Sequence, residues 1–312
     1  MIKSKIKIDL PEDHSQKGIW RFARFLSPVG ESFRLSLNEG NTGEEEITNL
    51  ILKREDQNPT GSVKDRGMAY LVSKAYENGQ KNLVLSSSGN AGISALNYCR
   101  LAGIKLFLFV SPNIEKGKKE EIEKLGGELR ISRKPLSESI KFAKTNKFFN
   151  LRPSTNEFGP EGFQTISFEL AKNQGYFEDI FIPVSSGVTL TGIARGFVKL
   201  GFMPRIHVCQ SSLVHPIAEK FTKEFIEEDQ SLARSLVAKT TPLKGEIIDL
   251  VKKSGGTGWI IANKEMLEAE EYLKSSNVDT SYEGALCVAA AKKAEKMFGY
   301  SKAVCLLTGK KY

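Results

Sequence analysis

Apolar and polar positions follow two alternating periods along the chain from about residue 64 onward. One set of apolar residues has the three- and four-residue spacing of a single helix face: Met68, Leu71, Val72, Ala75 and Tyr76. Gly79 can end that helix. Residues 83–85 then form a short apolar run typical of a buried strand, and residues 91–101 return to the helical period. The almost wholly apolar run 104–110 favours a strand that is covered on both faces.

The same alternation continues through the rest of the chain. The pattern predicts further helices at about residues 115–125, 136–146, 190–200 and 215–228. It predicts further strands at residues 179–184, 205–209 and 303–307. Strands that alternate with helices of this length indicate an α/β fold with a mostly parallel sheet and helices on both faces. Ligands bind such sheets outside the carboxyl ends of the strands, where several glycine-rich turns fall.

Composition is that of a globular protein, because 40% of the 312 residues are hydrophobic and 26% are charged. No run of about 18 apolar residues occurs, so we expect no membrane-spanning helix. The stretch Met1-Ile-Lys-Ser-Lys-Ile-Lys-Ile-Asp-Leu10 lacks the continuous apolar core of a signal peptide. We interpret it as an extended segment of a cytoplasmic protein.

The net charge of +8 has two interpretations. Clustered lysines and arginines would neutralise the phosphates of a nucleic acid. Here the lysines run from Lys3 to Lys311 and alternate with glutamates, as in residues 116–124. We therefore favour a solvated surface and expect no nucleic-acid partner.

Cysteine and histidine spacing argues against a disulfide framework or a metal site. The four cysteines are far apart and have apolar neighbours, which is typical of buried free thiols in a reducing compartment: Cys99, Cys209, Cys287 and Cys305. The three histidines have no Cys, Asp or Glu at ligand spacing: His14, His207 and His215.

Lys64 is the first candidate for chemistry. A predicted turn places this lysine at the start of a helix, in the stretch Glu55-Asp-Gln-Asn-Pro-Thr-Gly-Ser-Val-Lys-Asp-Arg-Gly-Met68. The positive end of the helix dipole and partial burial both disfavour the charged amine. A neutral amine can act as nucleophile and base. A surface lysine paired with Asp65 explains this segment equally well.

Two loops rich in serine and glycine follow predicted strands. In Leu85-Ser-Ser-Ser-Gly-Asn-Ala-Gly92, hydroxyls and backbone N–H groups at a helix N-terminus can bind a carboxylate, although a simple helix cap needs only one of these residues. In Pro183-Val-Ser-Ser-Gly-Val-Thr-Leu-Thr-Gly192, small residues let backbone amides converge on a phosphate. Taken alone, this second loop is a weak signal.

Taken together in this order, the three stretches closely resemble the threonine synthase branch of the fold-type II, or tryptophan synthase β-like, pyridoxal phosphate (PLP) enzymes. Asn58-Pro-Thr-Gly-Ser-Val-Lys-Asp-Arg-Gly67 matches the lysine motif of that branch almost residue for residue. Further similar segments cover nearly the whole chain: Gly18-Ile-Trp-Arg-Phe22, Leu35-Ser-Leu-Asn-Glu-Gly-Asn-Thr42, Glu161-Gly-Phe-Gln-Thr165, Ser254-Gly-Gly256 with residues 264–269, and Leu306-Leu-Thr-Gly309.

The resemblance implies an α/β fold of two domains, each with a mostly parallel sheet flanked by helices, and an active site in the cleft between them. Residues 1–62 and 150–312 would form the large domain, which binds the PLP phosphate, and residues 63–149 the small domain. It further implies a small amino-acid substrate, no membrane partner and a homodimer.

The resemblance also implies a role for each matching residue. Lys64 is the Schiff-base lysine and moves protons, and Asn90 binds the ring hydroxyl of PLP. The cofactor phosphate is held by Ser185, Ser186, Gly187, Val188 and Thr189. The substrate is held by Ser87, Ser88, Ala91, Arg152 and Ser154. Thr308 meets the pyridine nitrogen, and its neutral hydroxyl would leave the ring a weaker electron sink, which favours elimination and replacement over transamination.

Three departures from the family pattern bear on the substrate. The loop 185–189 is poorer in glycine than in the family, and the chain ends three residues after Gly309. The family's Asn-Ser pair and arginine for the substrate phosphate are Pro153-Ser154 and Gly159 here. Because a phosphorylated substrate needs charge-assisted donors, Arg152, Lys118 or Lys119 would have to replace that arginine.

These departures leave three functions open. The leading one is a threonine synthase-like lyase that converts O-phosphohomoserine and water to threonine and phosphate. A serine or threonine dehydratase, or a β-replacing synthase, would use the same lysine without a phosphate anchor. A catalytically silent PLP-fold binding protein is the third, because fold does not guarantee function.

Overall fold

The computed structural model describes residues 10–174, 177–300 and 302–311. Residues 1–9 of the predicted amino-terminal extended segment lie outside the described part. The chain divides into two compact units. Their bounds differ from the domain bounds expected from the sequence, which stay a prediction. The smaller unit contains Glu12–Gly40 and Asn58–Gly162. The larger unit contains Met1–Pro11, Asn41–Gln57 and Phe163–Tyr312.

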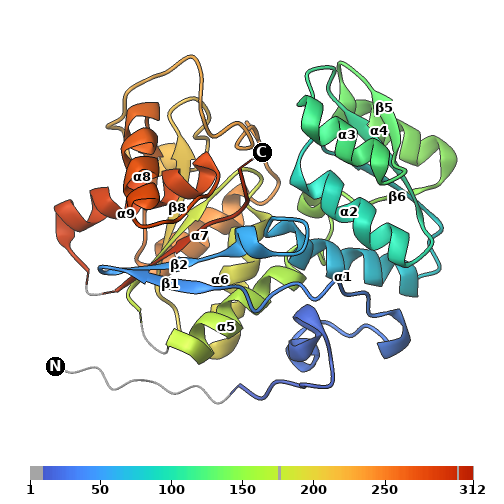
Figure 1. Ribbon diagram of the computed structural model, residues 1–312, viewed down its shortest axis with the longest axis horizontal. Coiled ribbons are helices and arrows are strands. Elements are labelled where there is room, and N and C mark those ends of the chain that lie inside the picture. Colours follow the sequence, from blue (N-terminus) through green and yellow to red (C-terminus); the bar gives the residue numbers. More distant parts are fainter. Residues whose placement is uncertain (1–9, 175–176, 301, 312) are drawn as a thin grey trace. The chain divides into compact units, whose positions relative to one another are not determined.

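The smaller unit is built on a four-stranded parallel sheet in the order β5-β4-β3-β6 (Figure 1). Its strands are β3 (Asn82–Ser86), β4 (Lys105–Val110), β5 (Glu128–Ile131) and β6 (Phe149–Asn150). Its helices are α1 (Lys64–Glu77), α2 (Asn90–Leu101), α3 (Lys116–Lys124) and α4 (Pro135–Asn146). Every helix and strand predicted in this part of the chain is confirmed. The polar edge strand β5 and the two-residue β6 have too few apolar positions to show a period, and the sequence missed them.

An apolar cluster attaches α4 to one face of this sheet. Val84, Phe107 and Phe109 of the strands pack with Ala143, and Phe142 and Phe148 complete the cluster. The helix α2 contacts β4, with α1 and α3 beside it. The run 104–110 is therefore buried on both sides, as its composition predicted.

The segment before α1 is irregular and is held by a buried carboxylate. It contains short 3-10 helices at Gly18–Phe25 and Glu31–Phe33, and others occur at Pro153–Thr155 and Glu161–Phe163. The side chain of Glu39 accepts hydrogen bonds from the Ile19 and Leu37 N–H groups, from the Ser36 hydroxyl and from the Tyr98 hydroxyl of α2. These bonds fasten the segment to the helix that follows β3.

The larger unit is built on a six-stranded sheet in the order β1-β2-β10-β7-β8-β9. The strands are β1 (Glu44–Ile47), β2 (Leu50–Lys53), β7 (Asp179–Pro183), β8 (Arg205–Ser211), β9 (Gly258–Ile261) and β10 (Ala303–Leu306). All neighbours pair in parallel except β1, which forms an antiparallel hairpin with β2. The predicted mostly parallel sheet is confirmed. A short 3-10 helix at Glu55–Gln57 follows β2.

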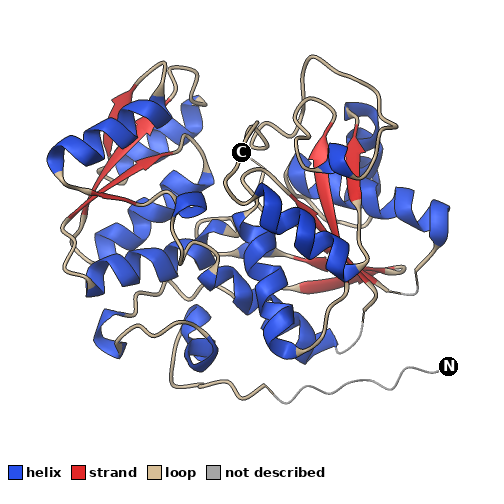
Figure 2. Ribbon diagram, turned by 180° about the vertical axis from the view of Figure 1, so that it is seen from behind, coloured by secondary structure: helices blue, strands red, loops and turns tan. Residues whose placement is uncertain are grey.

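Five helices cover this sheet, as Figure 2 shows in blue: α5 (Gln164–Gln174), α6 (Val188–Leu200), α7 (Lys244–Ser254), α8 (Asn263–Ser275) and α9 (Tyr282–Phe298). On one face Phe181, Trp259 and Cys305 pack in a single apolar cluster with residues of α8 and α9. Their neighbours along each strand point to the other face, because side chains alternate with period two. There α7 contacts β8, and α5, α6 and α7 contact one another in turn.

The prediction of a helix at residues 215–228 is wrong. Only Ala218–Lys220 are helical, as one 3-10 turn, and the chain then runs without regular structure to α7. The end of the segment is held by tertiary contacts instead. The Glu228 carboxylate accepts hydrogen bonds from the Ser212 hydroxyl and from the Asn263 N–H at the start of α8.

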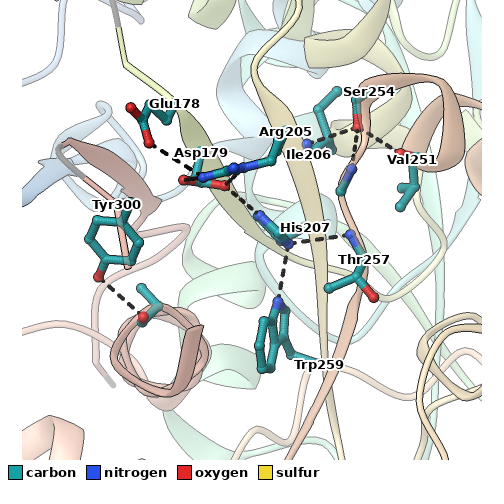
Figure 3. Close-up of polar contacts among 12 residues, drawn as sticks. Glu178, Asp179, Arg205, Ile206, His207, Val251, Ser254, Thr257, Trp259 and Tyr300 are labelled. Carbon is teal, nitrogen blue, oxygen red and sulfur yellow. Dashed lines mark hydrogen bonds and ion pairs between the residues drawn. The ribbon is translucent and has the colours of Figure 1, made fainter. Parts of the chain in front are cut away.

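A polar cluster joins the amino ends of β7 and β8, at the edge opposite the glycine-rich turns (Figure 3). Buried His207 lies 2.8 Å through Nε2 from Asp179 Oδ1, and its Nδ1 accepts the Trp259 indole N–H at 3.1 Å and the Thr257 N–H at 3.3 Å. Because Nδ1 accepts, the ring proton is on Nε2 and is donated to Asp179. Arg205 binds the same carboxylate through two nitrogens, at 2.6 and 2.7 Å.

Three other observations apply to the described part of the chain. No helix within it is long and apolar enough to cross a membrane. No group of three or more His, Cys, Asp or Glu residues in it could hold a metal ion. All four cysteines are buried free thiols, as predicted.

Candidate active site

In the smaller unit, two of the predicted site segments leave adjacent strands at the carboxyl edge of the sheet. Val84 of β3 is paired in register with Asn150 of β6. Ser86 and Arg152 lie two residues further along each strand, so the two chains leave the sheet side by side. The loop that begins at Ser87 and the segment with Arg152 are therefore neighbours.

Lys64 is the first residue of α1, as the sequence predicted, and it is half-buried. Its N–H donates a 3.3 Å hydrogen bond to the Ser62 hydroxyl, so the turn before the helix is held by its own serine. Gly61 in that turn has a φ of +83°, a conformation in which a side chain would be strained.

Asp65 is a buried positioning residue, and the sequence offered it only as a surface partner of Lys64. Its carboxylate is completely buried and accepts the Thr60 N–H at 2.7 Å, the Thr60 hydroxyl at 2.5 Å and the Ser94 hydroxyl at 2.6 Å. Burial raises the pKa of Asp65 to about 6, although the hydrogen bonds from Ser94 and Thr60 oppose the shift. The sequence feature that could have indicated this buried carboxylate is Thr60, which lies five residues before Asp65 and donates two hydrogen bonds to it.

The loop after β3 is closely packed against the helix that follows it. A Cβ at Gly92 would lie 2.8 Å from Ser87 O and 3.0 Å from Leu108 Cδ2, so only glycine fits there. Ser87, Ser88, Asn90 and Ala91 are all half-buried, and Asn90 begins α2. The Oδ1 atom of Asn90 is buried and has no hydrogen-bond partner in the described part of the chain.

Gly159 occupies a position where no arginine could stand without rebuilding the loop. A Cβ at Gly159 would lie 2.0 Å from Pro153 O and 3.0 Å from Asn156 O. Replacing Gly159 by arginine would therefore not restore the family's site, because the Pro153 carbonyl occupies the space where the side chain would begin. Ser154 in the same loop is buried.

The three cations that could replace that arginine differ in their surroundings. Lys118 Nζ lies 2.7 Å from Glu115, and Lys119 Nζ lies 3.8 Å from Glu123. Arg152 is half-buried two residues beyond the end of β6, and its N–H donates a 3.0 Å hydrogen bond to Asn150 Oδ1. The register of β3 and β6 sets Arg152 beside the loop that begins at Ser87.

In the larger unit, residues 185–189 connect β7 to α6, and we call them the phosphate loop. Gly187 has a φ of +85°, and a Cβ there would lie 2.0 Å from Ile247 Cδ1 of α7. Ser185 and Ser186 are half-buried, whereas Val188 and Thr189 are buried in the first turn of α6. The N-terminus of α6 presents backbone N–H groups and the positive end of the helix dipole to the loop.

Thr308 lies at the same edge of this sheet as the phosphate loop. Its strand β10 pairs with β7, with Cys305 opposite Phe181, so Thr308 and Val184 leave the sheet at the same level. The carbonyl of Gly309 accepts the Ser281 N–H at 3.0 Å and the Thr280 hydroxyl at 3.2 Å. On the other side of Thr308, the Leu307 N–H donates a 3.0 Å hydrogen bond to the Lys53 carbonyl. The backbone is therefore held before and after Thr308, which is itself half-buried.

The predicted residues thus gather at two carboxyl edges. The smaller unit brings Ser87, Ser88, Asn90, Ala91 and Arg152 to one edge, with Lys64 on the neighbouring helix α1. The larger unit brings the phosphate loop and Thr308 to one edge. Both arrangements follow the rule that open α/β sheets bind ligands outside the carboxyl ends of their strands.

Comparison with known proteins decides the family. The model of the family described as "Pyridoxal-phosphate dependent enzyme" matches residues 29–309. The chain belongs to this family. Its cofactor is pyridoxal phosphate, and it is a PLP-dependent enzyme.

Individual PLP enzymes are similar over most of their length. The threonine synthase of Methanocaldococcus jannaschii is 26% identical over 98% of this chain and 84% of that protein. The catabolic L-threonine dehydratase of Staphylococcus aureus is 26% identical over 78% of this chain and 72% of that protein. Maize serine racemase superimposes with a TM-score of 0.73 at 19% identity, over 84% of this chain and 83% of that one, and this likeness shows the fold.

The residues present fit PLP. The unsatisfied side-chain amide of Asn90 can pair with a ring hydroxyl, which the cofactor carries. Gly187 takes a φ of +85° where a Cβ would collide with Ile247, so this glycine allows the tight turn that leads into α6, whose first N–H groups can bind an anion. Together these features offer partners for two polar groups of the cofactor.

Proposed function

We propose that this PLP enzyme eliminates or replaces a group on an amino acid in a threonine synthase-like reaction. The observation that carries the proposal is the bond between Asp65 and Ser94, which joins the helix of Lys64 to the helix that follows the loop of Ser87 and Asn90. An amine and a set of carboxylate donors held on packed helices suit chemistry at the α-carbon of an amino acid.

Bound PLP supplies an electron sink for the bonds at the substrate α-carbon. In our proposal Lys64 Nζ attaches the cofactor and then takes and returns the α-proton. Asn90 holds the ring hydroxyl, and residues 185–189 hold the cofactor phosphate. Ser87, Ser88 and the N–H of Ala91 bind the substrate carboxylate at the start of α2.

Thr308 gives the site a neutral partner for the ring nitrogen. A threonine hydroxyl cannot stabilise a protonated ring nitrogen as a carboxylate would, so electron withdrawal is weaker. Departure of a leaving group then competes well with transamination. This preference fits elimination and replacement chemistry.

Two substrates follow from the loop around Gly159. If Arg152 and Ser154 bind a phosphate, O-phosphohomoserine loses phosphate at its γ-carbon, water adds at the β-carbon, and threonine forms. The position of Pro153 O favours the second candidate, a dehydratase or β-replacing synthase acting on serine, threonine or an O-activated serine. The Pro153 carbonyl removes the space for a second cation that would pair with a phosphate dianion.

Kinetics on purified PLP-loaded protein distinguish the candidates. Phosphate release from O-phosphohomoserine with matching threonine formation supports the synthase reaction. Oxo-acid and ammonia from serine or threonine support the dehydratase. If neither substrate nor an O-activated serine changes the visible spectrum of the bound cofactor, the chain is a silent PLP-binding protein.

We further propose that the enzyme acts in the cytoplasm as a homodimer on a small amino acid, with neither nucleic acid nor membrane as a partner. The four buried free thiols support a reducing compartment.

A further inference from the structure

The chain between β8 and α7 crosses the phosphate loop, and its contacts place one lysine there. The Ala238 N–H donates a 3.3 Å hydrogen bond to the Ser185 hydroxyl, and the Thr241 hydroxyl donates a 2.6 Å bond to Ser186 O. Lys239 follows Ala238 directly and lies two residues before Thr241. The backbone of Lys239 is therefore held on both sides against the two serines of the phosphate loop.

The segment that carries Lys239 is ordered although it is irregular; Figure 2 shows it among the tan loops of the larger unit. Ala233 and Leu236 are buried in the apolar cluster with α8 and α9. The Ser235 N–H donates to Glu283 at 2.9 Å, and the Leu232 N–H donates to Asn263 at 2.9 Å. Loops this long in compact proteins usually serve binding.

Lys239 differs from the other cations near this loop. Lys244 at the start of α7 lies 3.7 Å from Glu219, and Arg195 of α6 binds Glu246 at 2.8 Å. No carboxylate in residues 10–174, 177–300 or 302–311 pairs with Lys239, whose side chain is exposed. The backbone of Lys239 is held beside a loop at a helix N-terminus, and its exposed ammonium, which has no counter-charge among those residues, is available to an anion.

We propose that Lys239 binds the phosphate of PLP, together with residues 185–189. The proposal rests on the cofactor assignment and adds a residue that compensates for a phosphate loop with a single glycine, Gly187. Backbone N–H groups and the dipole of α6 supply partial charges, whereas Lys239 supplies a full positive charge.

Titration of the full-length protein freed of PLP tests the proposal, with pyridoxal as the ligand that lacks the phosphate. Lys239→Ala should weaken PLP binding by about 5-fold, the upper end for an exposed ion pair, and leave pyridoxal binding unchanged. Lys239→Arg should retain PLP affinity. Added salt should weaken PLP binding by the wild type more than by Lys239→Ala.

Lys253→Ala is the matched control, because Lys253 is an exposed lysine in the last turn of α7, and it should bind both ligands as the wild type does. The ratio of the two affinities also corrects for any general damage to the fold. Equal losses for PLP and pyridoxal, or an unchanged PLP affinity, would overturn the proposal. If the PLP-loaded variant instead loses affinity only for a phosphorylated substrate, the lysine serves that substrate and the proposal is wrong. Failure of the wild type to bind PLP at all would overturn the proposed function as well.

Discussion

The hydroxyl of Ser94 on α2 donates a 2.6 Å hydrogen bond to the buried carboxylate of Asp65, which follows Lys64 on α1. The same carboxylate accepts two bonds from Thr60, so one side chain connects the turn before Lys64, its helix and the neighbouring helix. A buried carboxylate with three donors fixes these elements firmly, because losing a partner leaves a charged group unsatisfied. We therefore expect the position of Lys64 to depend on the hydrogen bonds of Asp65, the next residue of α1.

Asp65→Asn should change how stability depends on pH. Burial raises the pKa of Asp65 from its ordinary value of 3.8 to about 6, with the bonds from Ser94 and Thr60 opposing the shift. A raised carboxyl pKa means that the folded state holds the proton more tightly, so this contribution is fully present below about pH 3.8 and is lost as pH rises through about 6. As the pH rises from about 5 to about 8, the wild type loses this contribution and the variant does not. The unfolding free energy of the variant relative to that of the wild type should therefore increase by about 1.4 kcal/mol.

Urea unfolding at the two pH values measures this difference. Asp249→Asn, which changes an exposed aspartate of α7, should show no such gain. A pH-independent difference between Asp65→Asn and the wild type would mean that Asp65 is ionised throughout that range.

His207→Gln should show the opposite pH dependence. Burial lowers the pKa of His207, although the hydrogen bond to Asp179 acts against the shift. The stability that neutral His207 contributes is present above its unfolded pKa of about 6.5 and is lost as pH falls below it. At about pH 8 the variant should lose about 2 kcal/mol through its lost hydrogen bonds, and this loss should shrink towards about pH 5.

The exposed His14 provides the control, because His14→Gln removes a histidine whose side chain is 78% exposed. Thermal unfolding of the wild type, His207→Gln and His14→Gln across this pH range would measure their stabilities. A stability loss in His207→Gln that grows as pH falls would contradict the neutral ring, protonated at Nε2, that we infer from the contacts drawn in Figure 3.

The sequence predicted most of the fold, because long segments have one clear period. The strand at residues 104–110 and the helix that begins at Lys64 are examples, and both are confirmed. The prediction was wrong at residues 215–228, where the chain is irregular and Glu228 makes tertiary hydrogen bonds that the sequence pattern does not show. Residues of the candidate site were found by motif, but the burial of Asp65 and the carbonyl beside Gly159 depend on contacts between separate segments, which periodicity does not show.

Arg152→Ala should act selectively on phosphorylated substrates. Because Gly159 leaves no room for an arginine, the wild type should already show a kcat/KM on O-phosphohomoserine about tenfold to a hundredfold below that of a site with its full set of charged contacts. Removing Arg152 should lower kcat/KM on O-phosphohomoserine by about a further tenfold and change serine and threonine little.

Lys118→Ala is the comparison, since Lys118 is already paired with Glu115. Gly159→Arg should disturb folding rather than raise phosphate selectivity, because its Cβ would lie 2.0 Å from Pro153 O. A wild type that strongly prefers the phosphorylated substrate, with that preference intact in Arg152→Ala and Lys118→Ala, would refute this account of the loop.

Thr308→Asp should move the reaction balance towards transamination. A carboxylate at this position stabilises a protonated ring nitrogen and makes the cofactor a stronger electron sink. We expect slow formation of pyridoxamine phosphate and oxo-acid, with cofactor binding retained. The products can be followed by absorbance and chromatography, with Thr308→Ser as the conservative control. Unchanged products would mean that Thr308 does not contact the ring nitrogen.

The most direct test of the central claim is the covalent position of the cofactor. Lys64 lies at the start of α1, within a family match that spans residues 29–309, and its proposed role as the PLP-binding lysine organises the rest of the proposed site. Borohydride reduction of the PLP-loaded protein, followed by proteolysis and peptide mapping, locates the modified lysine. The account predicts a pyridoxyl group on Lys64 and none after Lys64→Ala. A label on another lysine, or a protein that stays colourless with PLP, would contradict it.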